Sequence, residues 1–300
     1  MKAIEVKDLK KEYSTKEILR GIDFSVNKGE VFGFLGRNGA GKSTFIHILT
    51  GITNKTSGSF SILGQNDTEM DQIKKKIGVM PDTSNLYQYM NSVNFLKYMG
   101  GIKGDSRSRK EYIELLNKVG LFNVEKQKIK SFSFGMKKKI SIAQALLGNP
   151  DLIFLDEPTS GLDPESSIEI EQLILKLKSL GKTIFLTSHN LDEIERICDR
   201  VAIMNEGKIV KIGTINELKN DTNKSIQLAI RTIPFLNPQS LKSLLQSSIR
   251  YIKQQQDFTI LELDNEESIP ELVELLTANQ VKIYEMKIEK QSLQDVFMAV

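Results

Sequence analysis

A glycine-rich stretch near residue 40 has the residue types and the spacing needed to hold a chain of phosphates. It fits the pattern G-x-x-x-x-G-K-[ST] and consists of Gly36, Arg37, Asn38, Gly39, Ala40, Gly41, Lys42, Ser43 and Thr44. Glycines let backbone N–H groups turn inward around a phosphate, and a following helix adds its positive end. Lys42 supplies a charge for the β- and γ-phosphates, and Ser43 a hydroxyl for Mg²⁺. An apolar run before the loop and a helical pattern after it favour a phosphate site over a chance glycine turn.

Two adjacent carboxylates, Asp156 and Glu157, end a second apolar run at residues 152–155. An Asp at the tip of a core strand beside a phosphate loop can hold Mg²⁺ through water. Glu157, one residue further, could polarise a water in line with the γ-phosphate, which hydrolysis requires. The alternative for either carboxylate is a solvated strand end. The phosphate loop favours the functional interpretation, so the two motifs together predict hydrolysis of a bound phosphate chain.

The elements that must position these residues alternate between strands and helices. Apolar runs of strand length occur at residues 30–35, 152–155, 183–187 and 201–204. Helical patterns at 44–49 and 168–180 lie between them, which predicts a parallel sheet covered on its faces. Alternating residues at 3–7 and 18–26 predict an antiparallel β layer. Residues of about 83–149 have helical spacing with few strand signals, which predicts a helical insert.

A polar break around residues 220–223 predicts a boundary between two domains. The larger domain would comprise residues 1–220, and residues 221–300 would form a small α+β accessory domain. The second domain is expected to contain strands at 225–231, 248–253, 258–263 and 281–288 and helices at 238–246 and 269–278. Their order, βαββαβ, suits a two-layer domain of the split-βαβ type.

The overall composition is that of an ordinary globular protein. The net charge is only +3, which argues against a nucleic-acid partner, since such proteins usually carry a denser basic stripe. The lone Cys198 has no internal disulfide partner, as expected in a reducing compartment. No apolar run approaches the length that spans a bilayer, and the first residues lack a signal-peptide core. These features predict a cytoplasmic protein that would reach a membrane only through a partner.

The order of the motifs resembles the nucleotide-binding subunit of ABC transporters. The glycine loop at 36–44 matches the Walker A motif of that family, and residues 152–157 match its Walker B motif. The resemblance covers about residues 1–215. It implies a P-loop NTPase fold with a RecA-like α/β core, an antiparallel β subdomain and a helical subdomain. It also implies that the ligands are ATP and Mg²⁺ and that the protein is an ATPase.

Residues Ser133, Phe134, Gly135 and Met136 occupy the place of the LSGGQ signature of that family. In the family, the signature of one subunit closes over the ATP held by another, so the resemblance implies a head-to-tail homodimer. The Ser133 hydroxyl could donate to the γ-phosphate, and the amides of Gly135 and Met136 are expected to present a free anion site. An ordinary helix N-cap is the alternative for Ser133. Phe134 replaces the first signature glycine; we expect activity to survive because Gly135 is kept.

Four further residues take roles from the same resemblance. His189 joins Glu157 as an expected catalytic residue, although it could instead cap the helix that follows it. Asp163 falls in the D-loop and is expected to bridge the two subunits. Asp82 stands where the family has its Q-loop glutamine and could reach a metal-bound water, or it could be a turn residue after proline. Tyr13 lies where an aromatic ring stacks on adenine, with a surface or core tyrosine as the alternative.

The sequence also resembles the ATPase subunits of bacterial ABC-2 exporters, including bacitracin-resistance, lantibiotic-immunity and sodium-efflux systems. This likeness rests on residues 132–150, the stretch TSGLDP and the ending at residues 292–297. It implies a separate transmembrane permease and a peripheral location on the cytoplasmic face of the membrane. Two other classes are less favoured. An ABC ATPase acting on ribosomes or DNA usually carries two cassettes, a coiled coil or a basic linker, and Glu157 and His189 argue against a regulatory module without hydrolysis.

Two surface features complete the expectations. The lysines at 137–139 are expected to form the solvated face of the signature helix, with contact to anionic lipid as an alternative. Four residues could dock the permease or could instead pack inside the helical insert: Leu86, Tyr87, Tyr89 and Met90.

Overall fold

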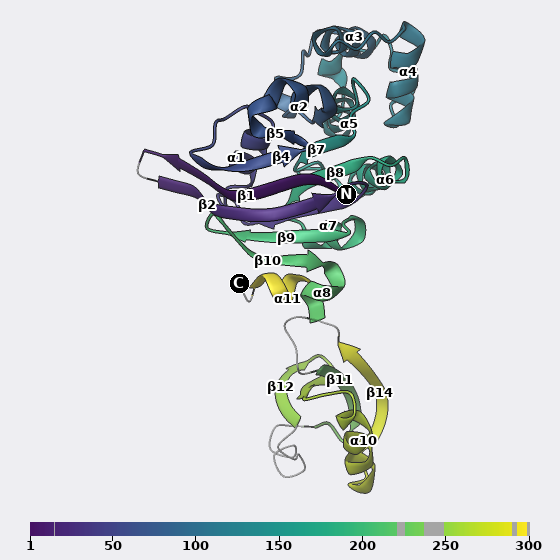
Figure 1. The fold of residues 1–300 in the computed structure, drawn as a ribbon. Helices are drawn as coiled ribbons and strands as arrows, with labels where there is room; N and C mark the ends of the chain where they lie inside the picture. The colour runs from purple at the N-terminus through teal and green to yellow at the C-terminus, as the bar shows by residue number, and fades with distance from the viewer. Residues whose placement is uncertain (15, 221–225, 237–248, 290–292, 299–300) are drawn as a thin grey trace. The chain divides into compact units, whose positions relative to one another are not determined.

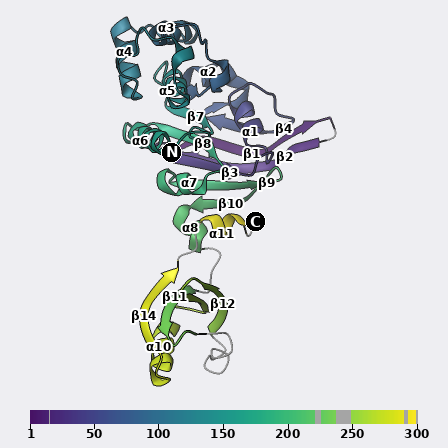
Figure 2. The ribbon, with the colours of Figure 1, turned by 180° about the vertical axis from the view of Figure 1, so that it is seen from behind.

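The protein is described here by a computed structural model that covers residues 1–14, 16–220, 226–236, 249–289 and 293–298. The chain divides into two compact units, Met1–Ile215 and Asn216–Val300, and each is described by itself. The division predicted from the sequence lay after residue 220. The whole chain is drawn in Figure 1 and is seen from behind in Figure 2.

A six-stranded sheet with the order β10-β9-β3-β8-β7-β6 forms the centre of the first unit. Its strands are β3 (Val31–Gly36), β6 (Ile77–Val79), β7 (Leu152–Asp156), β8 (Thr183–Ser188), β9 (Arg200–Asn205) and β10 (Lys208–Thr214). Neighbouring strands run parallel from β9 to β6, whereas β10 pairs with β9 antiparallel. The strands predicted at 30–35, 152–155, 183–187 and 201–204 are therefore parallel, as expected, and the unpredicted strand β10 makes the whole sheet mixed. The cause is a tight hairpin turn at Glu206 and Gly207, both with positive φ, that returns the chain beside β9.

A second, antiparallel sheet confirms the predicted β layer of the first unit. Its order is β2-β1-β4-β5, with β1 (Lys2–Tyr13), β2 (Lys16–Asn27), β4 (Ser57–Ile62) and β5 (Gln65–Asn66). Buried residues alternate with exposed ones along much of β2, as expected for a sheet with one face on a core.

Eight helices accompany the two sheets in the described part of the first unit and at its end. They are α1 (Lys42–Leu49), α2 (Met70–Lys76), α3 (Ser92–Lys103), α4 (Arg109–Lys118), α5 (Phe134–Ala145), α6 (Pro164–Ser179), α7 (Leu191–Ile197) and α8 (Ile215–Asn220). Helices α3, α4 and α5 gather at one end of the unit, beyond β7, and form the predicted helical insert (Figures 1 and 2). Helix α2 was not predicted, because it buries only Ile73 and therefore shows little apolar periodicity.

Aromatic packing fixes α1 against the central sheet. Every residue of β3 and β8 is buried, so both strands can be apolar on both faces. The rings of Phe34 on β3 and Phe45 on α1 stack with centroids 4.9 Å apart. Phe24, Phe32 and Phe185 extend the same cluster, with centroid distances of 5.3 Å for Phe24–Phe32 and 5.8 Å for Phe32–Phe185. This packing sets the position of the loop that joins β3 to α1.

The second unit contains a four-stranded sheet with the order β12-β13-β11-β14, in which all neighbours are antiparallel. Its described elements are β11 (Ile226–Ile233), β12 (Ile249–Gln255), β13 (Phe258–Leu263), α10 (Ser268–Ala278), β14 (Lys282–Glu289) and α11 (Leu293–Met298). Leu272 and Leu276 of α10 are buried with Leu228, Ile230 and Leu261 of the sheet in one core. The helix predicted at 238–246 lies outside the described residues, and α11 was not predicted.

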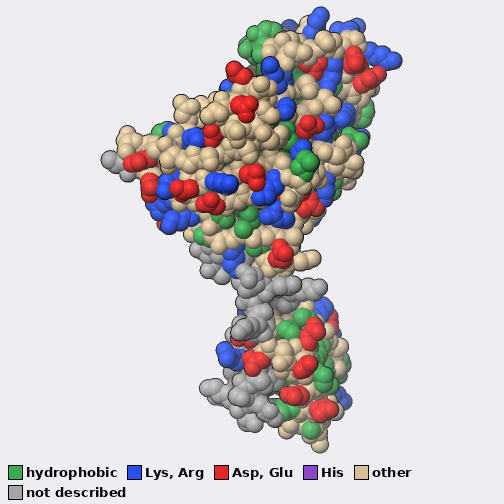
Figure 3. Space-filling model, in the orientation of Figure 1, with side chains coloured by type: hydrophobic (Ala, Val, Ile, Leu, Met, Phe, Trp, Pro, Cys, Tyr) green, Lys and Arg blue, Asp and Glu red, His purple; other side chains and the backbone are tan. Residues whose placement is uncertain are grey.

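Charges of both signs are interspersed on the surface of the first unit. On the face shown in Figure 3, Lys and Arg side chains alternate with Asp and Glu side chains rather than forming one continuous stripe. Among the described helices, none has both the length and the apolar character that a bilayer crossing demands.

Candidate nucleotide-binding site

A cavity of about 500 Å³ lies where the glycine loop joins β3 to α1. Strands β3, β7 and β8 are parallel neighbours, so their carboxyl ends share one edge of the sheet, which is where ligands bind in open α/β sheets. The cavity is lined from the loop, from the start of α1, from β2 and from the segments after β7 and β8. The lining residues are Lys16, Ile18, Asn38, Gly39, Gly41, Lys42, Ser43, Thr44, Glu157, Ser160 and His189.

The glycine loop closes on itself through its own lysine. The Nζ atom of Lys42 donates to the carbonyl oxygens of Gly36 at 2.6 Å and Arg37 at 3.3 Å. Gly41, just before α1, has a φ of 109°. A Cβ atom there would lie 2.9 Å from Met204 Cε and 3.1 Å from the Ile18 carbonyl oxygen, so no other residue fits without movement.

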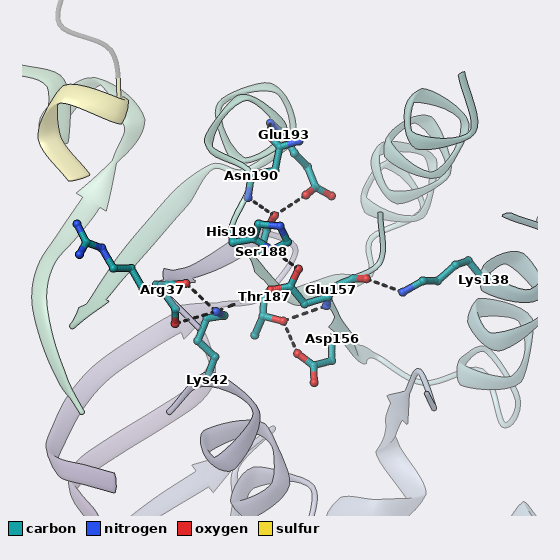
Figure 4. A network of polar contacts seen from close by, with 11 residues as sticks. Arg37, Lys42, Lys138, Asp156, Glu157, Thr187, Ser188, His189, Asn190 and Glu193 are labelled. Atoms are coloured by element: carbon teal, nitrogen blue, oxygen red, sulfur yellow. Dashed lines mark hydrogen bonds and ion pairs between the residues drawn. The ribbon is translucent and has the colours of Figure 1, made fainter. Parts of the chain in front are cut away.

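The other predicted loop residues differ in how they relate to the cavity. Asn38, Gly39, Ser43 and Thr44 line it, whereas the lining does not include Gly36, Arg37 or Ala40. The guanidinium of Arg37 points away from Glu157 (Figure 4). Ala40 is buried, and its carbonyl oxygen accepts the Gly207 N–H at 3.2 Å, so it ties the loop to the β9–β10 hairpin.

Glu157 and His189 meet at the cavity wall, as Figure 4 shows. Nδ1 of His189 lies 2.6 Å from Oε2 of Glu157, which is a hydrogen-bond distance. The second oxygen, Oε1, lies 3.8 Å from Nζ of Lys42. One carboxylate therefore stands between an imidazole and an ammonium group. Residues that are more than a hundred positions apart in the sequence are brought together by the parallel order of β3, β7 and β8.

A threonine joins Asp156 to the backbone of Glu157. The Glu157 N–H donates to Oγ1 of Thr187 at 3.0 Å, and the Thr187 hydroxyl donates to Oδ1 of Asp156 at 2.5 Å. The end of the neighbouring strand β8 thus holds the carboxylate of Asp156 and the backbone of Glu157. Thr187 is fully buried, and no motif in the sequence marked it as part of the site.

The oxygen atoms of Asp156 and Ser43 are the donors that a Mg²⁺ ion would use here. In the described ranges, no three His, Cys, Asp or Glu side chains gather in a way that could hold a metal. Mg²⁺ is usually bound by one or two carboxylates together with substrate phosphates and water, so a sparse set of protein oxygens is sufficient. The residues present therefore fit this ion when a nucleotide supplies the remaining ligands.

A buried carboxylate supports the segment that carries His189. The Ser188 hydroxyl donates to Oε2 of Glu193 at 2.6 Å, and the Asn190 N–H donates to Oγ of Ser188 at 3.0 Å. Burial raises the pKa of Glu193 above its ordinary value. The side chain of Asn190 caps α7, so the alternative in which His189 is the capping residue is wrong.

The signature residues begin α5 and lie outside the cavity lining. Ser133 is the N-cap of α5, and its Oγ accepts the N–H of Met136 at 3.2 Å. The expectation of a free anion site is therefore wrong for the Met136 amide, because the serine of the same chain already caps it. At Gly135, a Cβ atom would lie 3.2 Å from Oγ of Ser166, so its close approach is to α6.

Lys138 corrects the expectation that the three lysines of α5 form a solvated face. Its side chain is buried, with the residue only 8% exposed, and its Nζ donates to the Glu157 carbonyl oxygen at 2.7 Å. Burial lowers the pKa of Lys138 below its ordinary value. Nζ of Lys139 pairs with Oε2 of Glu169 at 2.7 Å, and Lys137 is half-buried.

Asp82 and Asp163 both act as caps in this structure. Oδ1 of Asp82 accepts the Ser84 N–H at 2.8 Å, as the turn alternative expected, and this hydrogen bond lowers the pKa of Asp82. Asp163 caps α6 and accepts the Ser166 N–H at 2.9 Å, which lowers the pKa of Asp163. Neither residue lines the cavity.

The wall on the side of the antiparallel sheet comes from β2. Tyr13 is exposed at the end of β1 and does not line the cavity, whereas Lys16, its partner across the β1–β2 pair, and Ile18 do. Sequence reasoning missed Lys16 and Ile18, and also Ser160 after β7. Only Ser160 had a signal, because it begins the stretch that contains Asp163.

The residues considered for permease docking separate into two groups. Leu86 is buried at 5% exposure and so packs inside the unit. Tyr87 and Tyr89 are exposed, at 49% and 80%, and Met90 is half-buried. The expectation that these residues pack inside the helical insert is thus correct for Leu86, whereas Tyr87 and Tyr89 lie at the surface.

Two family models match the chain. One, described as ABC transporter, matches residues 19–160. The other, described as the C-terminal domain of DrrA1-3-like ATP-binding proteins, matches residues 213–300.

Curated relatives match this chain over 69% to 100% of its length. The linearmycin resistance ATP-binding protein LnrL of Bacillus subtilis is 33% identical over 307 aligned residues, which cover 98% of this chain and 97% of the relative. The daunorubicin/doxorubicin resistance ATP-binding protein DrrA of Streptomyces peucetius is 31% identical, with 100% and 92% covered. The lantibiotic transport ATP-binding protein SrtF of Streptococcus pyogenes is 40% identical over 69% of this chain and 89% of its own length.

Solved structures match about 70% of the chain. The ATP-binding subunit of an ABC transporter is 30% identical, with a TM-score of 0.66, over 73% of this chain and 93% of the other. A dimeric ATP-binding cassette in a post-hydrolysis state with ADP and Pi is 25% identical, with a TM-score of 0.65, over 70% and 98%.

Proposed function

Because the chain belongs to the family of ABC transporter ATP-binding subunits, we propose that it binds ATP in the cavity beside Lys42 and hydrolyses it to drive a separate export permease. The observation that carries the proposal is the meeting of Lys42, Ser43, Glu157 and His189 around one cavity. These are the residue types that phosphate binding and water activation require.

Binding begins at the glycine loop. The Nζ atom of Lys42 now lies on the carbonyl oxygens of Gly36 and Arg37, and a bound phosphate chain would give it a stronger, anionic partner. The N-terminus of α1 adds a positive partial charge at the same place. Ser43 and Asp156 would hold Mg²⁺, which neutralises charge on the β- and γ-phosphates when it is bound.

Hydrolysis would depend on Glu157 as the group that accepts a proton from the attacking water. Its Oε2 atom is oriented by His189, and its backbone N–H by Thr187. These contacts fix the carboxylate before the substrate arrives, so little reorganisation would be needed at the reacting step.

A second copy of the chain would complete the pocket. Ser133, Phe134, Gly135, Met136 and Asp163 do not line the cavity of their own chain. Their position at the exposed start of α5, and just before α6, suits contact with the nucleotide and cavity rim of another subunit. The dimeric cassette with ADP and Pi supports this proposal, since it is similar over 70% of this chain. We therefore propose a homodimer that forms on ATP binding, head to tail, and in it the Ser133 hydroxyl turns from its own helix to the γ-phosphate.

Export of an antibiotic-like compound is the transport function that the relatives favour. Three of them are named for linearmycin resistance, daunorubicin/doxorubicin resistance and lantibiotic transport. We propose that this chain works on the cytoplasmic face of the membrane, bound to a permease encoded separately, and that the exposed rings of Tyr87 and Tyr89 contact it.

The experiment is an ATPase assay on the purified full chain with Mg²⁺, beside Lys42→Ala. The proposal expects hydrolysis by the wild type, and a loss of about 100-fold or more in the variant, because the charge that holds the transferred phosphate is gone. A wild-type chain that neither binds ATP nor hydrolyses it would overturn the proposal.

A further inference from the structure

We propose that Lys138 is a positioning residue for Glu157, and that through it hydrolysis in a chain's own cavity depends on where its signature helix lies. The inference rests on the proposed function, because it assigns a role to a residue behind the same ATPase site. Lys138 belongs to α5, the helix that begins at the signature residues, whereas Glu157 follows strand β7.

The contact is made by a buried cation and a backbone oxygen. Lys138 is 8% exposed, and its Nζ donates to the Glu157 carbonyl oxygen at 2.7 Å. Figure 4 shows the side chain reaching from α5 to the backbone of Glu157. The same oxygen also accepts the Ser160 N–H at 3.3 Å, within the turn that follows β7. The shorter, charge-assisted bond therefore comes from a different structural element.

The backbone of Glu157 needs such support. Its φ is 49°, in the left-handed region, which costs a residue with a side chain about 1 to 3 kcal/mol and persists only where surrounding contacts impose it. Thr187 Oγ1 accepts the Glu157 N–H on one side of the Cα atom, and Lys138 holds the carbonyl on the other. Together they fix the direction in which the carboxylate leaves the chain, toward His189 and Lys42.

A purely structural role would be served better by an apolar side chain. Burying an ammonium group costs desolvation energy, which is why burial lowers the pKa of Lys138. Four carboxylates act on this cation and partly offset that cost: Asp82, Asp156, Glu157 and Glu193. The charge of Lys138 thus lowers the stability of the fold through its desolvation, while it strengthens the hydrogen bond to Glu157 in the site.

Phe134, which stands in place of the first signature glycine, contacts the same lysine. Nζ of Lys138 lies 5.6 Å from the ring centroid of Phe134, within cation–π distance. The ring also lies against the chain after Glu157, since a Cβ atom at Gly161 would be 3.0 Å from it. Phe134 therefore covers the lysine that reaches the base.

This arrangement connects two nucleotide sites in a dimer. In the proposed dimer, Ser133 at the start of α5 contacts the ATP of the partner subunit. Lys138, little more than one turn further along the same helix, contacts the base of its own cavity. A shift of α5 on engaging the partner's ATP would move the Lys138 ammonium relative to the Glu157 carbonyl, so one site would sense whether the other is filled.

The test compares Lys138→Met, which keeps length and removes the donor, with Lys138→Arg, which keeps a donor. The matched control is Lys139→Met, which removes an ammonium group and its pair with Glu169 from the same helix. All are measured as full chains for kcat and KM of ATP hydrolysis. We expect kcat of Lys138→Met to fall about tenfold or more with KM within about twofold, because small displacements of a catalytic group are costly. Lys138→Arg should keep kcat within about threefold of the wild type, and Lys139→Met should match the wild type.

A second readout separates base placement from dimer closure. In a Glu157→Gln background, Lys138→Met should still form an ATP-bound dimer, because Ser133 and Met136 are untouched. Wild-type kcat in Lys138→Met, an equal loss in Lys139→Met, or failure of arginine to restore turnover would overturn the inference while leaving the proposed ATPase intact. A wild type without ATPase activity would overturn both. Should Lys138→Met not fold, Lys138→Leu, which also lacks a hydrogen-bond donor, carries the same comparison.

Discussion

The cavity beside Lys42 and the start of α5 differ in how firmly their side chains are held and in how exposed they are. In the cavity, Lys42 and His189 each contact the Glu157 carboxylate, and the buried Thr187 of the neighbouring strand holds the Glu157 backbone. At the start of α5, Ser133 and Phe134 are exposed, and the Ser133 hydroxyl oxygen accepts the Met136 N–H from the first turn of its own helix.

The difference indicates how one chain divides the work of an ATPase site. Groups that must be preorganised before reaction lie in the rigid edge of a sheet, where parallel strands hold them. In the proposed dimer, the groups that bind the partner's ATP lie at the surface, at a helix terminus where Ser133 would exchange the amide of its own helix for a phosphate. Under this proposal, one copy carries a preorganised half of the site, the cavity, and a second half, the start of α5, that acts on another copy.

Removing the proposed base from the cavity should have the largest effect on the rate of ATP hydrolysis. Glu157→Gln keeps the size of the side chain and loses the proton acceptor, so hydrolysis should fall by about 100-fold or more while ATP still binds. A radiolabelled ATP assay with a parallel binding titration measures both quantities. Turnover at the wild-type rate would show that Glu157 is not the base.

Blocking the start of α5 should lower ATP turnover without lowering the affinity of the cavity for nucleotide. Ser133→Arg places a bulky cation at the start of α5, where we expect it to prevent a second copy from closing, with turnover reduced at least about tenfold. Nucleotide affinity, measured by equilibrium titration, should stay near that of the wild type because Ser133 does not line the cavity. A loss of binding equal to the loss of turnover would contradict the division into halves.

Asp82 lies in neither half, and its substitution should be milder. Asp82→Ala removes the cap on the Ser84 amide, so the free energy of unfolding should fall by about 1 kcal/mol. Basal turnover and its dependence on Mg²⁺ concentration should change by no more than about threefold. A much higher Mg²⁺ requirement in this variant would instead support the metal role expected from the sequence.

The smallest expected effect is on stability, and it comes from Glu193, the buried carboxylate that accepts the Ser188 hydroxyl next to His189. Burial raises the pKa of Glu193 in the folded state above 4.5, so its stabilising contribution is full below that value and is lost as the pH rises through the folded pKa. The amide in Glu193→Gln does not titrate. Thermal unfolding measured across pH should therefore show the Tm of the variant rising relative to that of the wild type as the pH increases from about 4.5. A difference that stays constant with pH would argue that Glu193 is not held in an unfavourable environment.

Local spacing accounts for what the sequence predicted well. The glycine loop, the carboxylates after β7 and the histidine after β8 each follow an apolar run, and the parallel order of those runs brings them to one edge. The strands of the second unit were also predicted near their observed bounds, because period-two alternation survives in short segments. The antiparallel β10 was missed, although Glu206 and Gly207 offered a hairpin signal.

Contacts between distant elements account for the rest. Lys138 looked like one of three solvated lysines, and nothing in its neighbourhood in the sequence points to the Glu157 carbonyl. Thr187 looked like one more residue of a buried strand. The sequence predicts that Ser133 can cap α5, but it does not indicate that this cap occupies the Met136 amide of the expected anion site. Such roles depend on tertiary packing, which composition and period do not encode.

The oligomeric state of Glu157→Gln with ATP and Mg²⁺ tests the account most directly, because the variant should bind nucleotide without consuming it. Sedimentation velocity should show a dimer with ATP and a monomer without it, and Ser133→Arg in the same background should stay monomeric. A species that remains monomeric with saturating ATP, both alone and with its permease, would contradict the claim that two copies complete each site.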